Sequence, residues 1–247
     1  MIGTVVTTGT VVAPDLLTVA GLHKRFGDYD ALVDIRFDVR AGEILGIIGP
    51  NGAGKTTLME CLVGLQPVDA GRFTWRTAPL PAADRKRHFF YLPDGIAPWG
   101  ELTARSVLDF FADQCGRGPA DLDRVIERLR LSPVLAKPVA ALSKGYRRRL
   151  LLVLALLSPQ PLVMLDEPFD GFDLKQTLEA VTLLRELAGA GRTLMLSIHQ
   201  LADAARICDR FLLLGQGKVL GLGSLEELMA QAGVTAGGLE EVFLALA

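Results

Sequence analysis

The segment Gly49–Thr56, which reads GPNGAGKT, constrains the fold of this chain more than any other part of the sequence. Its glycines, lysine and threonine match the P-loop pattern, and it lies between a short apolar run, Ile44–Ile48, and a predicted helix, Lys55–Leu65. In a P-loop the backbone N–H groups and the helix N-terminus bind phosphate oxygens, while the lysine adds positive charge and the threonine hydroxyl can bind Mg²⁺. A match at four fixed positions arises by chance in only about one chain per hundred of this size. The sequence therefore predicts a strand, loop and helix that bind the phosphates of a nucleotide.

Two other short apolar runs predict the sheet that carries this loop. Leu162–Leu165 and Thr193–Ile198 are too short for helices and lack alternating polar residues, which is typical of strands that helices cover on both faces. Predicted helices, Leu150–Leu157 and Leu178–Leu187, precede them along the chain. This alternation predicts an α/β fold with a P-loop NTPase core and a parallel sheet.

Two further regions differ from this core. Before the P-loop, Ile35, Phe37 and Val39 alternate with charged residues, which predicts an antiparallel strand and an antiparallel β subdomain. Within 105–131 the spacing is helical and the polarity higher, which predicts an inserted α-helical subdomain over about residues 95–158. Residues 16–247 are expected to form one domain, with residues 1–15 as a tail or an extra strand, since the start of the chain lacks the basic residues of a signal peptide.

The composition argues against several classes of protein. Half the residues are hydrophobic, but the longest unbroken apolar run, Leu150–Leu157, is far shorter than the roughly 20 residues that cross a bilayer. The 26 Lys and Arg residues are balanced by 28 Asp and Glu residues without a long block of one sign, which argues against a nucleic-acid-binding surface. Cys61, Cys115 and Cys208 have no C-x-x-C spacing, so we expect small buried side chains rather than zinc ligands or disulfides.

Polar residues follow two of the predicted buried strands. Asp166 and Glu167 come directly after Leu162–Leu165, and His199 follows Thr193–Ile198, so all three are expected at the carboxyl edge of the sheet. Asp166 is suited to holding Mg²⁺, Glu167 to activating a water that attacks a γ-phosphate, and His199 to contacting that phosphate. The alternatives are an acidic pair that caps a helix and a histidine without a chemical role.

A basic helix start is predicted near residue 143. Ser143, in the segment LSKGY, precedes Arg147–Arg149 and a Leu-rich run, which predicts a helix with Ser143 as its N-cap. Cations in the first turn oppose the helix dipole. Either they pair with nearby carboxylates, or this helix end faces an anion such as a phosphate, and the pattern does not choose between the two.

Together these residues resemble the nucleotide-binding domain of ABC (ATP-binding cassette) transporters, and the resemblance covers the chain from about Leu16 to its end. Five segments are similar to the family's motifs and stand in the family's order. They are a Walker A motif (GPNGAGKTT from Gly49), a signature (LSKGY from Leu142), a Walker B motif (LVMLDEP from Leu162), a D-loop (DGFD from Asp170) and a switch histidine (SIH from Ser197). The resemblance implies an ABC ATP-binding domain over residues 16–247, with ATP and Mg²⁺ as its cofactors.

The resemblance also implies roles for individual residues. Phe26, in KRFG, would stack on adenine, and Glu167 and His199 would be catalytic. Ser143 and Gly145 would contact the γ-phosphate held by the other subunit of a head-to-tail dimer. The residues implied to contact ATP are Phe26, Gly49, Asn51, Gly52, Ala53, Gly54, Lys55, Thr56, Thr57, Ser143, Gly145 and Asp173, and those implied to contact Mg²⁺ are Thr56, Asp166 and Asp94.

Two positions depart from the family's pattern. Asp94 follows Phe90–Pro93, where the family's Q-loop has Gln or sometimes Glu, and the shorter side chain puts its direct contact with Mg²⁺ in doubt. Tyr146 replaces the Gln of the signature, which resembles single-cassette subunits of exporters of the ABC-2 type. The terminal LEEVFLALA, from Leu239, is similar to those subunits as well.

The resemblance implies a transport ATPase. ATP binding would close a dimer of the chain with itself or with a paralogue, hydrolysis would reopen it, and the helical subdomain would pass the motion to a separate transmembrane permease. Such a subunit lies peripherally on the cytoplasmic side of the cell membrane, and no nucleic acid is expected as a partner. Two alternatives keep the same site: a soluble ABC ATPase without a transport role, and a regulatory subunit that hydrolyses ATP weakly, which Asp94 suggests.

Overall fold

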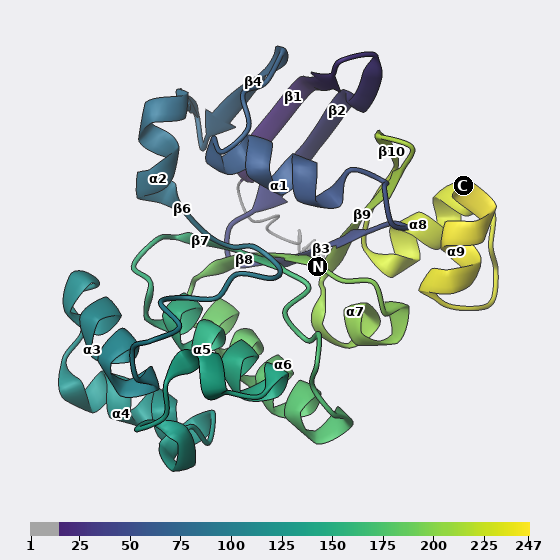
Figure 1. Ribbon diagram of the computed structural model, residues 1–247. Coiled ribbons are helices and arrows are strands. Elements are labelled where there is room, and N and C mark those ends of the chain that lie inside the picture. Colours follow the sequence, from purple (N-terminus) through teal and green to yellow (C-terminus); the bar gives the residue numbers. More distant parts are fainter. Residues whose placement is uncertain (1–14) are drawn as a thin grey trace, which may run out of the picture.

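The computed structural model of the chain describes residues 15–247, and Figure 1 shows how its sheets and helices are arranged. The predicted tail or extra strand over residues 1–15 lies outside the described residues except for Asp15, which begins the first strand. Within residues 15–247, no helix combines the length and the apolarity that crossing a bilayer requires.

A six-stranded sheet forms the core of the described part, in the order β10–β9–β3–β8–β7–β6. Its neighbouring strands are parallel, except that β10 runs antiparallel to β9. The three predicted buried strands are confirmed as β3, β7 and β8, in which every residue is buried. The strands are β3 (Ile44–Ile48), β6 (Phe89–Leu92), β7 (Leu162–Asp166), β8 (Thr193–Ser197), β9 (Arg210–Gly215) and β10 (Lys218–Gly223).

Alternate residues of β3 face two different hydrophobic cores. Ile44 and Ile48 pack in the core that contains α5 (Lys144–Leu157) and α6 (Leu174–Gly189). Leu45 and Ile47 pack in the core that contains α1 (Lys55–Val63) and the second sheet. Figure 1 shows α1 above the core sheet and α5 and α6 below it. The P-loop therefore directly follows a strand that is covered on both faces, as predicted.

The second sheet is antiparallel, in the order β2–β1–β4–β5. Leu32, Ile35, Phe37 and Val39 of β2 are buried against the core below, which explains their alternation with exposed or half-buried residues. The predicted antiparallel strand is confirmed, although β2 is longer than the alternating residues because it pairs with β1 over most of its length. The strands are β1 (Asp15–Phe26), β2 (Tyr29–Arg40), β4 (Ala70–Trp75) and β5 (Ala78–Pro79).

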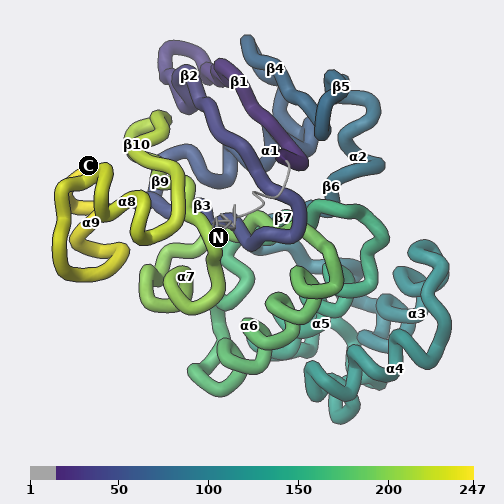
Figure 2. The backbone as a smooth tube through the Cα atoms, turned by 180° about the vertical axis from the view of Figure 1, so that it is seen from behind, coloured from purple at the N-terminus to yellow at the C-terminus, as the bar shows by residue number. Residues whose placement is uncertain are grey.

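Helices fill most of the chain between β6 and β7, as the sequence predicts. A short break separates the first two of these helices, because α3 ends at Gln114 and α4 starts at Pro119. Figures 1 and 2 both show α3 and α4 at one end of the molecule and the C-terminal helices α8 and α9 at the other. The remaining helices are α2 (Arg85–His88), α3 (Ala104–Gln114), α4 (Pro119–Arg128), α7 (Leu201–Ile207), α8 (Leu225–Ala232) and α9 (Leu239–Leu246).

Caps decide where the predicted helices begin and end. Ser143 is the N-cap of α5, as predicted, and its Oγ accepts a hydrogen bond from the Tyr146 N–H at 3.4 Å. Asp173 caps α6 in the same way at 2.8 Å, so that helix starts before the predicted Leu178. The first helix ends at Val63 rather than Leu65 because Gly64, with φ of 85°, takes the left-handed conformation that ends helices.

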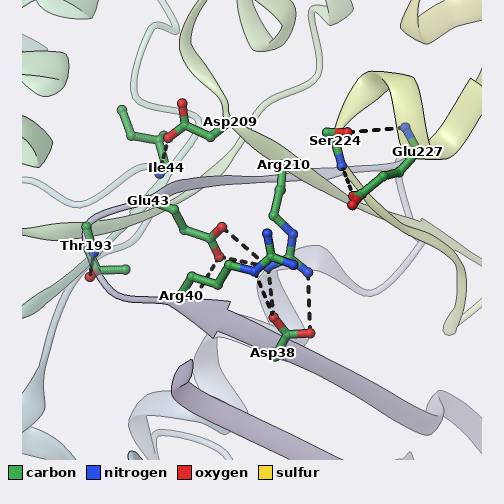
Figure 3. A network of polar contacts seen from close by, with 10 residues as sticks. Asp38, Arg40, Glu43, Ile44, Thr193, Asp209, Arg210, Ser224 and Glu227 are labelled. Carbon is green, nitrogen blue, oxygen red and sulfur yellow. Dashed lines mark hydrogen bonds and ion pairs between the residues drawn. The ribbon is translucent and has the colours of Figure 1, made fainter. Parts of the chain in front are cut away.

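Arg210, at the start of β9, joins the two sheets through buried ion pairs (Figure 3). Its Nη1 lies 2.8 Å from Asp38 Oδ2 on β2 and 3.2 Å from Glu43 Oε1, which directly precedes β3. Burial raises the pKa of the Glu43 carboxyl, although hydrogen bonds from the Arg40 N–H and from Arg210 act against this. A buried guanidinium requires such partners, and this network links the antiparallel sheet to the core sheet.

Candidate functional site

A cavity of about 410 Å³ lies at the carboxyl ends of β3, β6 and β7. In open α/β sheets this edge is where ligands bind. Except for Tyr29 and Ala31, every lining residue is one that the sequence singled out. The lining consists of Phe26, Tyr29, Ala31, Asn51, Gly52, Gly54, Lys55, Thr56, Thr57, Asp94, Asp166 and Glu167.

The P-loop backbone requires glycine at two positions for different reasons. Gly54 has φ of 101°, and a Cβ placed there would lie 2.8 Å from Leu32 Cδ2. A Cβ at Gly49 would lie only 2.4 Å from the carbonyl oxygen of Leu214. Helix α1 starts directly after Gly54, and no side chain of the described residues caps its first turn. Its first backbone N–H groups are therefore available to an anion in the cavity.

The side chain of Lys55 folds back over the P-loop. It is buried, and its Nζ donates hydrogen bonds to the carbonyl oxygens of Gly49 at 2.8 Å and Pro50 at 3.2 Å. No carboxylate within residues 15–247 forms an ion pair with it. The ammonium group therefore brings an unneutralised positive charge to the cavity, as phosphate binding requires.

Thr56 and Asp166 bring two oxygen donors together. The Thr56 hydroxyl donates a hydrogen bond to Asp166 Oδ2 at 2.8 Å, although the two residues are far apart in the sequence. Asp166 is buried at the end of β7, so its carboxylate faces the cavity from a fixed position. A hydroxyl and a carboxylate are hard ligands of the kind that Mg²⁺ prefers when phosphates supply further oxygens. The donor set therefore fits Mg²⁺ beside a bound nucleotide.

Glu167 and His199 are in direct contact. His199 Nδ1 lies 2.5 Å from Glu167 Oε2 at the carboxyl edge of the core sheet. Glu167 has φ of 50°, a left-handed conformation that is unusual for a residue other than glycine, and its N–H donates to the Ser197 carbonyl oxygen on β8. The strained turn therefore aims the carboxylate at His199 while keeping it in the lining of the cavity.

Two aromatic residues form the wall of the cavity on the side of the antiparallel sheet. Phe26 and Tyr29 face each other across the turn between β1 and β2, and both are exposed. The Nζ of Lys24 lies 4.6 Å from the centre of the Phe26 ring. Tyr29 was not predicted, but its place opposite Phe26 follows from the hairpin, in which Gly27 and Asp28 form the turn.

Some predicted residues do not line this cavity. Gly49 and Ala53 shape the loop instead: Ala53 is buried, and its N–H donates to the Pro50 carbonyl oxygen. Ser143, Gly145 and Asp173 lie elsewhere, at the starts of α5 and α6. Within one chain, the signature residues therefore do not reach the site that the P-loop forms.

The basic start of α5 pairs with carboxylates in the structure. Arg148 is buried, and its Nη2 lies 2.5 Å from Asp94 Oδ1 and 3.9 Å from Asp170 Oδ2. Lys144 lies 2.6 Å from the same oxygen of Asp170, and this hydrogen bond holds the pKa of the Asp170 carboxyl below its usual range. Of the two alternatives that the sequence left open, the pairing with carboxylates is the one observed for Lys144 and Arg148. Asp94 is thus bound to α5 although it lines the cavity.

Comparison with known proteins places this site in a family. The family model described as "ABC transporter" matches residues 32–170. The Nod factor export ATP-binding protein I of Ralstonia nicotianae is 32% identical over 222 residues, which are 87% of this chain and 68% of that protein. The daunorubicin resistance ATP-binding protein DrrA3 of Streptomyces coeruleorubidus is 34% identical over 228 residues, which are 90% and 72% of the two chains.

Solved structures agree with the sequence relatives. A structure described as the ATP-binding subunit of an ABC transporter superposes with a TM-score of 0.85 at 31% identity, covering 94% of this chain and 99% of that one. A bacterial Atm1-family ABC exporter with ATP bound has a TM-score of 0.78 at 21% identity, covering 90% of this chain and 41% of that one, which shows the shared fold. The predicted family and fold class are therefore confirmed, and this chain belongs to the ABC transporter family as one of its ATP-binding, ATP-hydrolysing proteins.

Proposed function

We propose that this chain is the motor subunit of an ABC exporter. Two copies, or one copy and a paralogue, close head to tail on ATP and drive a separate transmembrane permease from the cytoplasmic side of the membrane. One observation carries the proposal: Lys55, Thr56, Asp166 and Glu167 share one cavity, whereas the signature at the start of α5 lies outside it. A second subunit is the natural source of the missing signature.

The binding residues have separate tasks. The N–H groups at the start of α1 and the ammonium group of Lys55 bind the phosphates, and Phe26 stacks on the adenine. Asn51, Gly52 and Thr57 line the same cavity and contact the nucleotide beside them. Thr56 and Asp166 hold Mg²⁺, which neutralises charge on the phosphate oxygens when it is bound.

Glu167 and His199 act on the attacking water. The Glu167 carboxylate orients this water and accepts its proton, since it lines the cavity next to Asp166. The contact between His199 Nδ1 and Glu167 Oε2 fixes the carboxylate and the imidazole relative to each other. With a proton on Nε2 as well as on Nδ1, the imidazolium donates to the γ-phosphate, where negative charge must be stabilised.

The dimer completes the site. Ser143 and Gly145 of the signature and Asp173 of the D-loop reach the phosphates held by the other subunit, which assigns a task to residues that stand apart from their own P-loop. In the separate chain Ser143 is exposed, as is required of a residue that contacts a second subunit. Helix N-termini bind anions well, so the start of α5 is suited to a phosphate of the partner subunit.

The permease docks at the helical end of the molecule. Four exposed apolar side chains lie in the chain between β6 and the middle of α3, and two of them, Trp99 and Phe110, pack edge to face with ring centres 5.7 Å apart. Exposed apolar side chains that lie together mark protein interfaces. The four are Ile96, Trp99, Leu102 and Phe110. The names of the relatives, which include Nod factor export and daunorubicin resistance, favour export as the direction of transport.

ATP turnover and dimerisation test this function together. Wild type and Glu167→Gln are compared for Mg²⁺-dependent hydrolysis and for their elution in size-exclusion chromatography with ATP and Mg²⁺. The proposal expects turnover in the wild type, its loss in the variant, and an ATP-dependent dimer of the variant. A variant that hydrolyses ATP at the wild-type rate would refute the role of Glu167, and one that binds ATP but stays monomeric would refute self-dimerisation.

A weakly hydrolysing regulatory subunit is the second candidate. It is favoured by the contact between Asp94 and Arg148, which occupies the Q-loop carboxylate with a guanidinium. Slow turnover in the wild type that Asp94→Gln raises several-fold would support this candidate over the motor.

A further inference from the structure

Arg148 is a buried charge that the proposed catalytic cycle does not use. Its side chain is only 6% exposed, and it lies in the first turns of α5, directly beyond the signature. Burying a guanidinium is costly unless hydrogen-bonded carboxylates compensate its charge. Its Nη1 is buried without a hydrogen-bond partner among the described residues, so the contacts of its Nη2 carry most of this compensation.

The two carboxylates near Arg148 are not equivalent. Asp94 Oδ1 lies 2.5 Å from Nη2, within hydrogen-bond distance, whereas Asp170 Oδ2 lies 3.9 Å away. Asp170 is already bound at 2.6 Å by Lys144. Asp94 is therefore the close partner of Arg148, and this contact ties the segment after β6 to α5.

Asp94 also belongs to the nucleotide cavity. It lines that cavity together with Thr56 and Asp166, whose oxygens fit Mg²⁺. A carboxylate at this edge is itself a suitable Mg²⁺ ligand. Its oxygens can serve either a charged hydrogen bond to the guanidinium or a cation in the cavity, and the structure shows the first.

We propose that Arg148 is a positioning residue of the ATPase, which holds the carboxylate of Asp94 on α5 and away from the metal position beside Thr56 and Asp166. The proposal rests on the metal position given under "Proposed function". It extends that function by making the guanidinium of Arg148 and the metal competitors for one carboxylate. A Gln at position 94, which carries no charge, would not compete in this way.

The proposal predicts a gain of metal affinity when Arg148 is removed. In Arg148→Met the Asp94 carboxylate is released and adds a ligand to the metal, so the metal's contribution to ATP binding increases by about tenfold. Asp94→Asn is expected to leave that contribution within about threefold of wild type. In the double variant Asp94→Asn/Arg148→Met the gain disappears, because the carboxylate that would bind the metal is absent.

Calorimetry measures this contribution without relying on turnover. All variants are made in the Glu167→Gln background, and ATP is titrated into each in the presence of Mg²⁺ and in the presence of EDTA. The ratio of the two dissociation constants is the quantity compared. Arg149→Met is the matched control, since it removes the same charge from the next position of α5, where the guanidinium lies over the Tyr146 ring at 4.8 Å. Its ratio is expected to equal that of the parent chain.

Each outcome decides the question. If the gain in Arg148→Met persists in the Asp94→Asn background, the loss of a positive charge alone strengthens metal binding, and the proposal is overturned. The absence of any gain in Arg148→Met would also overturn it. A parent chain whose ATP affinity does not depend on Mg²⁺ would instead overturn the metal site on which the proposal rests. If Arg148→Met does not fold, Arg148→Gln, which keeps polar donors at the buried position, is measured in its place with the same expected gain.

Discussion

At the scale of the residue, the contact between His199 and Glu167 has the most direct consequence for turnover. The imidazole lies 2.5 Å from the carboxylate that the proposed function makes the general base. Both the orientation of that base and the donor to the γ-phosphate depend on the ring. Without the imidazole, the Glu167 carboxylate remains in the cavity but samples other rotamers. The site then still binds ATP and Mg²⁺, but the attacking water is no longer held in the reactive position.

We therefore expect His199→Ala to lower kcat by about 100-fold while the KM for ATP changes by less than about threefold. Steady-state ATPase assays at saturating Mg²⁺ measure both constants. His88→Ala is the matched control, because the His88 ring packs on Trp75 with ring centres 4.5 Å apart and does not line the cavity. Comparable losses of kcat in the two variants would contradict a catalytic role for His199.

The three cysteines give a second prediction at this scale. Burial raises the pKa of the Cys61 thiol to about 11, and burial also raises the pKa of Cys208 and Cys115. Only Cys115 is partly exposed, so it alone should react with a thiol reagent in the native chain, at a rate that still increases between pH 8 and pH 9. Spectrophotometric thiol titration should give one fast group in buffer and three in urea. Cys115→Ser should lose the fast group, and a fast reaction that survives this change would show that the assignment is wrong.

At the scale of the element, the starts of α5 and α8 allow stability to be separated from function. Ser143 and Ser224 both cap a helix through their hydroxyl groups, and Ser224 forms a capping box with Glu227. Replacing either serine by alanine removes one hydrogen bond to the backbone of the first turn. The two substitutions therefore remove comparable hydrogen bonds from two different helices.

Ser143→Ala and Ser224→Ala are each expected to lower the free energy of unfolding by about 1 kcal/mol. Only Ser143→Ala should also weaken the ATP-dependent dimer, because the proposed function places Ser143 at the phosphate of the partner subunit. Urea unfolding measures the first effect, and size-exclusion chromatography in the Glu167→Gln background measures the second. If the two variants dimerise equally, Ser143 does not lie at the dimer interface and this part of the proposed function is wrong.

The elements also show how far the sequence determines the structure. Strands β3, β7 and β8 were predicted within one residue because each is an apolar run buried on both faces, a signal that needs no knowledge of neighbours. The P-loop and the ends of these strands likewise placed Lys55 and Asp166 at one edge. The burial of Arg148 could not be predicted, because its partners Asp94 and Asp170 lie far away in the sequence and become neighbours only when β6, α5 and β7 pack together.

At the scale of the whole molecule, the cavity depends on how the two sheets are held together. Phe26 and Tyr29 come from the antiparallel sheet, whereas Lys55 and Asp166 come from the core, so the wall for adenine and the phosphate loop are carried by different sheets. Arg210 joins these sheets through Asp38 and Glu43 (Figure 3). Since Arg210 and Glu43 are both buried, removing the guanidinium leaves a carboxylate with little access to water.

Arg210→Met is therefore expected to lower the free energy of unfolding by about 3–5 kcal/mol at pH 8. The loss should be smaller at pH 5. Burial already raises the folded-state pKa of Glu43, so this carboxyl favours the folded state at low pH, and the benefit is lost as the pH rises through the raised pKa. Without Arg210 that pKa rises further, and protonation at pH 5 neutralises the buried carboxylate that remains charged at pH 8.

Urea unfolding of wild type and Arg210→Met at both pH values measures this difference. Arg206→Met is the control, because Arg206 is half exposed on α7 and lies 3.9 Å from Asp203, so its loss should cost less than about 0.5 kcal/mol at either pH. Adding Glu43→Gln to Arg210→Met should abolish most of the pH dependence, since the titrating group is then absent. If instead the penalty were the same at pH 5 and pH 8, Glu43 would not be the uncompensated charge, and the two sheets would be held together chiefly by the apolar contacts of the core between them.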